Sequence, residues 1–323
     1  MSEPAVIFED NRIIVVIKPR NAPCVADDSG DESLQEQLKS FIKARDGKDG
    51  NAFVGVVHRL DRVTGGVMVY AKNSKSAARL SEEIKSGAFK KTYLAVVKGD
   101  PKQKSATLVN YLAKDENKNV VAVVPQTTTG AKRAELYYEV VGTKNGYSLL
   151  KINLGTGRSH QIRVQLKYIG YPLVGDNRYG GVKADNIALW AYQLEFVHPG
   201  TDDNMKFIVN PPEDGVWANF DFDRREHKLR GKAGGVGSAN DIGATGGVAN
   251  SAGSADGANA TGGVGSANDM GATDGVTVPN VKDVANSGGR AVVVNATGGV
   301  DGVMVANIKD GANATGIAEG GAE

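Results

Sequence analysis

Apolar residues recur in short runs over the first 220 residues, and their spacing predicts both strands and helices. The run at residues 12–18 (RIIVVIK) is strand-like and ends at Pro19. Apolar side chains at helical spacing predict helices over 33–45, 74–86 and 159–169, with Gly87 and Gly170 ending the last two. Runs rich in Val, Tyr, Leu and Ile predict further strands over residues 66–71, 91–98, 136–141, 147–154, 188–196 and 205–209.

The order of these elements indicates the fold class. Many strands with a few interspersed helices, in no regular strand–helix–strand rhythm, are typical of an α+β fold with a mixed or antiparallel sheet. We therefore assign residues 1–222 to one globular domain.

Residues 231–323 show a different pattern. They contain 23 Gly in 93 positions and no Phe, Tyr or Trp, so they lack the large side chains that offset the entropy cost of ordering. The segment 234–248 (GGVGSANDIGATGGV) recurs with small changes at 262–276. A repeat is also typical of a solenoid, but no apolar residue recurs at a fixed position. We predict a low-complexity, disordered tail over residues 223–323.

Charge and cysteine content narrow the function classes. The 323 residues carry a net charge of +1, but residues 221–323 hold 8 basic and 12 acidic side chains, which leaves +5 on the first 220. A mildly basic domain permits an anionic partner. The one cysteine, Cys24, excludes an intramolecular disulfide and a cysteine-rich zinc site. The sequence shows neither a secretory signal nor an apolar run of about 18 residues. We expect a cytoplasmic protein without membrane contact, monomeric by default.

Common cofactor and metal motifs are absent. There is no GxGxxG after a strand, no P-loop, no HExxH and no GxSxG. The histidines are His58, His160, His198 and His227, too few for a histidine-rich metal site.

Two polar clusters are candidates for a functional site. The first is HRLDRVTGG at residues 58–66, where Arg59 and Arg62 flank Asp61 in a loop bounded by glycines. An ion-paired surface turn explains this cluster as well as a site does. The second is GTGRSHQIR at residues 155–163, and its Gly-rich start and free helix N–H groups suit a phosphate. An ordinary capped amphipathic helix is the alternative.

Helical spacing divides the residues after the second cluster into two faces. Ile162, Leu166 and Ile169 form a buried stripe, and His160, Arg163 and Lys167 lie together on another face. A lone carboxylate in a partly dry pocket needs a cation to stay ionised, and Arg163 is the candidate partner of Asp61. Together the clusters indicate a site with one aspartate beside arginines, facing an anionic substrate.

Five motifs in order resemble those of the RluA-type pseudouridine synthases. They are FEDNRIIVVIKP at 8–19, HRLDRVTGG at 58–66, KTYLA at 91–95, GRSHQIRVQ at 157–165, and PLVGD at 172–176 followed by YG at 179–180. The resemblance runs from about residue 6 to residue 212. It implies a mixed, largely antiparallel sheet with flanking helices and a central RNA-binding cleft.

The resemblance also implies residue roles. Asp61 is the essential catalytic aspartate, Arg163 pairs with it, and Tyr93 stacks on the target base and acts in a later proton transfer. Arg59 resembles the arginine that displaces the target nucleotide. We expect the remaining RNA contacts from Arg62, Lys91, Arg158 and His160. The implied activity is the isomerisation of uridine to pseudouridine in ribosomal or transfer RNA, without cofactor or metal.

Three departures from the family pattern concern substrate identity more than activity. Gly65 stands where serine is usual, Gln165 replaces a histidine, and residues 20–26 (RNAPCVA) lack another histidine. Because the domain begins near residue 5, we expect no N-terminal RNA-binding module.

Two alternatives to the pseudouridine synthase activity remain. One is a catalytically silent RNA-binding protein on this scaffold, and the other is a hydrolase that uses Asp61 with His58.

Overall fold

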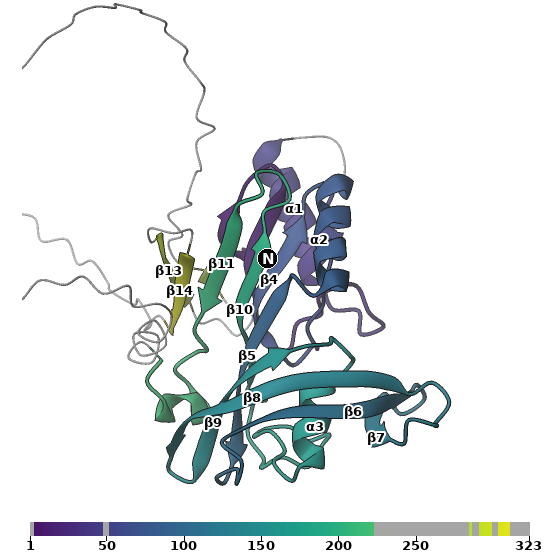
Figure 1. Ribbon diagram of the computed structural model, residues 1–323. Coiled ribbons are helices and arrows are strands. Elements are labelled where there is room, and N and C mark those ends of the chain that lie inside the picture. The colour runs from purple at the N-terminus through teal and green to yellow at the C-terminus, as the bar shows by residue number, and fades with distance from the viewer. Residues whose placement is uncertain (1–2, 48–51, 223–283, 286–290, 299–302, 311–323) are drawn as a thin grey trace, which may run out of the picture. The chain divides into compact units, whose positions relative to one another are not determined.

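The computed structural model describes residues 3–47, 52–222, 284–285, 291–298 and 303–310 (Figure 1). All described helices and strands belong to one compact unit, which excludes residues 222–276. Most of the tail predicted to be disordered lies outside the described residues. None of the described helices has the length and apolar content needed to cross a membrane.

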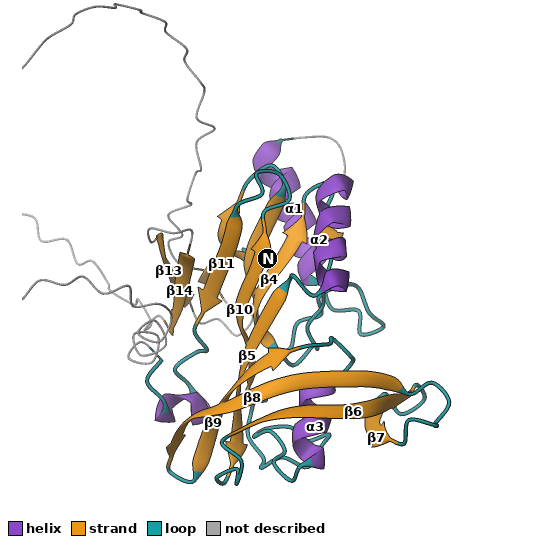
Figure 2. Ribbon diagram, viewed as in Figure 1, coloured by secondary structure: helices purple, strands orange, loops and turns teal. Residues whose placement is uncertain are grey.

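A mixed sheet of 14 strands dominates the described part of the chain (Figure 2). Its strands are β1 (Ala5–Glu9), β2 (Ile13–Lys18), β3 (Gly55–Val56), β4 (Gly65–Ala71), β5 (Lys90–Lys98), β6 (Ser105–Asp115), β7 (Val120–Val124), β8 (Lys132–Lys144), β9 (Tyr147–Leu154), β10 (Leu189–Val197), β11 (Asn204–Val209), β12 (Val284–Ala285), β13 (Ala291–Gly298) and β14 (Val303–Asp310). The main path runs β12-β13-β14-β11-β10-β5-β9-β8-β6-β7, and β4 connects β10 to β2 and β3, with β1 beside β2.

The strand directions confirm the predicted class. All neighbouring strands run antiparallel except β4 beside β10 and β11 beside β14. The parallel pair matters for the site, because Gly65 and Gly66 at the start of β4 lie opposite Trp190 and Ala191 of β10. The other edge of β10 pairs with β5, where Ala191 lies opposite Tyr93. The loop that precedes β4 is thereby brought close to β5.

The three α-helices begin and end at clear sequence signals. Helix α1 (Leu34–Asp46) starts with a capping box between Ser33 and Glu36, and Gly47 ends it in the left-handed conformation. Helix α2 (Ser74–Ser86) is capped by Asn73 and ends at Gly87, as predicted. Helix α3 (Gln161–Tyr168) packs against β6 and β7. A 3₁₀ turn, η1, spans Gly215–Asn219.

A continuous hydrophobic core lies between the sheet and the helices. It contains Leu34 and Leu38 of α1, Tyr70 of β4, and Ile162 and Leu166 of α3, each buried. Helix α1 and the site helix α3 are therefore anchored to the same sheet.

Four strands that precede the tail were not predicted, and a fifth is longer than predicted. The four are β1, β3, β6 and β7, and β8 extends beyond the predicted range of 136–141 at both ends. Only Leu112 in β6 and Val121 in β7 are buried. β6 carries polar residues among its apolar ones, so its hydrophobic signal is weak, whereas β7 (VVAVV) is an apolar run too short for its period to identify the element.

Three described strands lie inside the predicted tail. β13 and β14 form an antiparallel pair, and β14 runs parallel to β11, with residues 303–306 opposite residues 206–209. The prediction of a disordered tail is therefore wrong for the residues of β12, β13 and β14. The runs AVVVNAT and VMVANI supply the β-branched residues that favour strands.

Candidate active site

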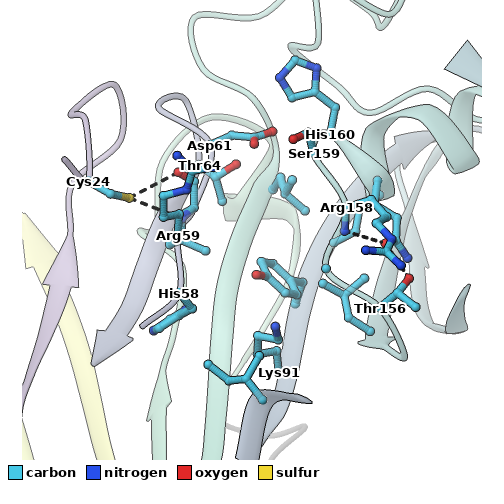
Figure 3. Close-up of a pocket in the computed structure, with 18 of the residues that line it drawn as sticks. Cys24, His58, Arg59, Asp61, Thr64, Lys91, Thr156, Arg158, Ser159 and His160 are labelled. Carbon is cyan, nitrogen blue, oxygen red and sulfur yellow. Dashed lines mark hydrogen bonds between the residues drawn. The ribbon is translucent and has the colours of Figure 1, made fainter. Parts of the chain in front are cut away.

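A cleft of about 940 Å³ lies between the loops at residues 58–64 and 155–160. All eight residues with a predicted catalytic or RNA-binding role line it: Arg59, Asp61, Arg62, Lys91, Tyr93, Arg158, His160 and Arg163. Figure 3 shows Asp61 and Ser159 approaching each other from the two loops, with His160 beyond them and Lys91 at the far end. The fold thus brings the two sequence clusters to one site.

Two buried side chains hold the Asp61 loop. Lys18 is completely buried, and its ammonium group donates hydrogen bonds of 2.8 to 2.9 Å to the carbonyl oxygens of Pro19, Arg62 and Thr64. Cys24 donates from Sγ to the carbonyl oxygen of Leu60 at 3.2 Å. Burial lowers the pKa of Lys18 to about 8, so the ammonium form still dominates at neutral pH. The backbone around Asp61 is therefore fixed on both sides.

Arg163 connects Asp61 to a second carboxylate. Its Nη1 donates to Asp61 at 3.2 Å, while Nε and Nη2 donate to the two oxygens of Asp176 at 2.8 and 2.7 Å. The Asp176 carboxylate is fully buried, and that of Asp61 is 26% exposed. Burial works to lower the pKa of Arg163, but the two carboxylates outweigh it and the pKa is raised. Arg163 is therefore a permanent cation, held in a fork by Asp176 and aimed at Asp61.

Strand β5 presents Lys91 and Tyr93 to the same cleft. Tyr93 is only 7% exposed, and burial and the charge of Asp61 raise its pKa, so the phenol stays protonated. Its hydroxyl has no hydrogen-bond partner among the described residues. Burial lowers the pKa of Lys91, which forms no ion pair within the described part of the chain. An aromatic ring and an unpaired cation beside one carboxylate suit a nucleotide.

The loop before α3 is anchored to β8. The side chain of Gln161 accepts hydrogen bonds from Thr156 Oγ1 at 2.8 Å and Arg158 N at 3.0 Å, and it donates to the carbonyl oxygen of Glu135 at 2.9 Å. Arg158 donates from Nε to the carbonyl oxygen of Arg133. These bonds position the wall of the cleft that faces Asp61.

The arginines at the cleft edge differ in their partners. Arg59 is exposed and has no ion-pair partner in the part of the chain that is described. Arg62 forms ion pairs with Asp27 and Asp31 and donates to Ser29 at 2.7 Å. Its predicted contact with RNA therefore requires a phosphate to displace these carboxylates.

Some residues important for the geometry carried no role in the sequence analysis. Lys18, Asp176 and Tyr179 all contact predicted site residues or their loops. Asp176 and Tyr179 belong to the PLVGDNRYG stretch, which contributed to the resemblance but pointed to no function. Within the described ranges, no three carboxylate, imidazole or thiol side chains are placed to hold a metal ion.

His58 lines the cleft but is a packing residue by its contacts. It is 8% exposed, its Nε2 accepts a hydrogen bond from Val69 N at 3.1 Å, and its ring lies 5.5 Å from that of Phe89. Burial lowers its pKa to about 3. The imidazole is thus neutral at physiological pH, and the nitrogen that a general base would use is already occupied.

Replacing His58 with glutamine is expected to remove an acid-sensitive part of the stability. The unfolded chain binds a proton as pH falls through about 6.5, whereas the folded chain resists protonation down to about 3, so stability is complete above 6.5 and lost as pH falls. Between pH 7 and pH 4, urea unfolding should show wild type losing about 3 kcal/mol more than His58→Gln, since each pKa unit is worth about 1.4 kcal/mol. Equal losses in both proteins would disprove the assignment.

Gly65 differs from the usual serine for a packing reason. A Cβ atom added there would lie 2.4 Å from Cζ3 of Trp190, and the Trp190 indole is fixed by a hydrogen bond of 2.9 Å to the carbonyl oxygen of Val209. Gln165, the second departure, is completely buried and donates to Leu108 and Asn110 of β6. Neither residue lines the cleft, so both departures concern packing around the site.

Gly65→Ser is expected to lower the free energy of unfolding by about 1–3 kcal/mol, the usual cost of overpacking a core. The cost should fall in a Trp190→Leu background, because the obstructing ring is then absent. Denaturant unfolding of the two single variants and the double variant gives the coupling. Additive effects would show that Trp190 is not the obstacle.

The sequence is similar to those of known RNA pseudouridine synthases. Residues 12–168 match the family described as RNA pseudouridylate synthase. An uncharacterized RNA pseudouridine synthase of Bacillus subtilis is 31% identical over 221 residues, which cover 66% of this chain and 76% of that protein. The ribosomal large subunit pseudouridine synthase D of Borreliella burgdorferi is 32% identical over 219 residues, and 65% of each protein is covered.

A solved structure shows the same fold. The human RNA pseudouridylate synthase domain containing 4 superposes with a TM-score of 0.56 at 20% identity, over 70% of this chain and 93% of that one. This likeness concerns the arrangement of the sheet and helices.

Proposed function

The chain belongs to the RNA pseudouridylate synthase family, and on this premise we propose that it converts specific uridines of ribosomal or transfer RNA to pseudouridine, with Asp61 as the catalytic residue. The observation that carries the proposal is the Asp61–Arg163 ion pair in a cleft that also holds Tyr93.

The reaction makes limited chemical demands, and the cleft residues match them. The C1′–N1 bond breaks, the uracil rotates, and a C1′–C5 bond forms. N1 gains a proton and C5 loses one, so atoms and electrons balance without a cofactor. Asp61 either attacks C1′ or removes the 2′ proton to give a glycal. Both routes need an ionised carboxylate, which the Arg163 cation stabilises.

Substrate binding is assigned to the other cleft residues. The target base must leave the helix stack, which costs a few kcal/mol, and the Tyr93 ring offers a replacement stacking surface. Arg59 helps to displace the target nucleotide, while Lys91, Arg62 and Arg158 hold the RNA backbone. Support for ribosomal RNA comes from the similarity to a relative named for the ribosomal large subunit. The protein acts as a cytoplasmic monomer.

The test is tritium release from RNA labelled at C5 of uridine. Total RNA from a source strain lacking this gene supplies unmodified sites. Release by wild type, followed by mapping of the new pseudouridine, supports the proposal. RNA binding without release would instead support a catalytically silent RNA-binding protein, and free uracil would support the hydrolase alternative.

We expect residues 1–222 to contain all the residues needed for catalysis, since every proposed site residue precedes residue 164. A chain ending at Asp223 should retain tritium release within about 3-fold of the full chain. A loss of 10-fold or more would show that the tail, for example through the pairing of β14 with β11, contributes to activity.

A further inference from the structure

Tyr179, in the loop that follows α3, is a buried side chain that packs against the predicted polar face of the helix. Its ring lies 5.0 Å from Cζ of Arg163 and 5.7 Å from Nζ of Lys167, and the ring of His160 meets it edge-on at 5.7 Å. The residue is 2% exposed. Tyr179 thus contacts all three polar residues that helical spacing placed on one face.

The hydroxyl of Tyr179 has one backbone donor and one imidazole partner. It accepts a hydrogen bond from Val121 N of β7 at 2.9 Å, and it lies 2.7 Å from Nδ1 of His160. Since the oxygen already accepts from Val121, its own proton needs an acceptor. Among the described residues only His160 Nδ1 is within reach, so Tyr179 donates to Nδ1.

This bond determines which nitrogen of His160 carries the proton. Nδ1 is an acceptor, and in the neutral ring Nε2 then carries the hydrogen. Nε2 has no partner within the described part of the chain, and His160 lines the cleft next to Asp61 (Figure 3). The backbone of His160 is left-handed, with φ of 50°, a conformation uncommon for residues other than glycine.

Burial and four nearby charges act on the pKa of His160. Burial lowers its pKa, Asp61 and Asp176 act to raise it, and Arg163 and Arg178 act to lower it further, so the net shift is downward. The ring is therefore neutral at pH 7. A neutral donor differs from the arginines and lysines that bind phosphates, because it suits an uncharged oxygen.

We propose that Tyr179 is a positioning residue that fixes His160 as an Nε2–H donor, and that this donor binds an uncharged oxygen of the RNA in the cleft, either a base carbonyl or a ribose hydroxyl. The inference rests on the proposed RNA substrate. It assigns His160 to nucleotide recognition and separates it from the phosphate contacts.

The tautomer is tested on the free protein. Nitrogen NMR of histidine-labelled full-length chain, which has four histidines, distinguishes the two imidazole tautomers, and His160→Asn identifies the signal. Wild type should show His160 protonated at Nε2, and Tyr179→Phe should shift the signal toward a mixture. A wild-type ring protonated at Nδ1, or no change in Tyr179→Phe, would overturn the positioning role.

The ligand class is tested by the salt dependence of binding to a transcript that carries the mapped uridine. In His160→Asn the amide oxygen replaces Nδ1 and asparagine tolerates the left-handed backbone, so the change removes mainly Nε2–H. We expect Kd to rise about 5- to 10-fold, the range of one net hydrogen bond, with an unchanged slope of log Kd against log salt. Arg158→Gln, as the comparison, should reduce the slope by about 0.7.

The outcomes separate the two proposals. A reduced salt slope in His160→Asn would assign the contact to a phosphate, and an unchanged Kd would exclude the contact. Tyr179→Phe should raise Kd less than His160→Asn does, and the double variant should be no weaker than His160→Asn alone. If wild type neither binds RNA nor releases tritium, the proposed function fails while the NMR result stands.

Discussion

Asp61→Asn is expected to abolish tritium release from C5-labelled RNA, with a fall in rate of at least about 10⁴-fold, because removal of an essential catalytic group costs this much in well-studied enzymes. Asparagine keeps the size of the side chain and an oxygen for Arg163, so the fold and the cleft should be retained. RNA binding should stay within about 3-fold of wild type, measured by filter binding at the same salt concentration.

Asp27→Asn is the matched control, because Asp27 is a second carboxylate that lines the cleft. It pairs with Arg62, which keeps Asp31 as a partner when Asp27 is neutralised. We expect its rate within about 3-fold of wild type. If Asp61→Asn keeps more than a tenth of the wild-type rate, Asp61 is not the catalytic group.

The requirement for charge at Asp61 follows from its surroundings. The carboxylate is 26% exposed, and within the described residues its one cationic partner is Arg163, at 3.2 Å. Either proposed route gives Asp61 a bond to carbon or to a proton, and both need its electron pair. The asparagine amide oxygen keeps its lone pairs but carries no negative charge, so it is a far weaker base and nucleophile than a carboxylate, and we expect it not to support either route.

The sheet class and the α-helices were predictable from sequence because their signals are local. Gly87 ends α2, and the central strands are continuous runs of buried residues, as in β5, where the six residues 92–97 are all buried. β6 was missed because polar residues interrupt its apolar ones, and β7 was missed because a five-residue apolar run shows no readable period. The clusters around Asp61 and Arg163 were visible, and the need of a lone carboxylate for a cation suggested their pairing, which the family resemblance supported. The contact itself spans 102 positions, so no local pattern could place it.

Other site features depend on tertiary contacts that no spacing reveals. Lys18 ends an apolar strand, and nothing in that run indicates that its ammonium group binds three carbonyl groups beneath Asp61. The clash that excludes a serine at position 65 involves Trp190, which lies across a parallel strand pair. The contacts of Tyr179 with His160 and of Asp176 with Arg163 likewise form only when α3 packs beside the loop that carries Tyr179 and Asp176.

Asp176→Asn is expected to have the second-largest effect, on both stability and turnover. The Asp176 carboxylate is fully buried and accepts two of the hydrogen bonds that Arg163 donates. Breaking a buried ion pair by neutralising one partner costs about 3–5 kcal/mol, because the remaining charge is left uncompensated. Urea unfolding should show this loss. In the folded fraction, kcat should fall about 100-fold with little change in KM, since Asp176 does not line the cleft.

A double variant shows whether Asp176 acts through Arg163 or through the fold in general. Arg163→Met removes the cation that Asp176 holds, so Asp176→Asn should add almost nothing to its loss of kcat. Substitutions of residues that act as one network reduce kcat non-additively in this way, whereas two substitutions that damage the structure independently reduce kcat by the product of their separate effects. Multiplied losses in Asp176→Asn with Arg163→Met would mean that Asp176 supports the site by packing alone. Non-additive losses would mean that the charge of Asp61 is maintained by a cation which itself needs a second, buried carboxylate.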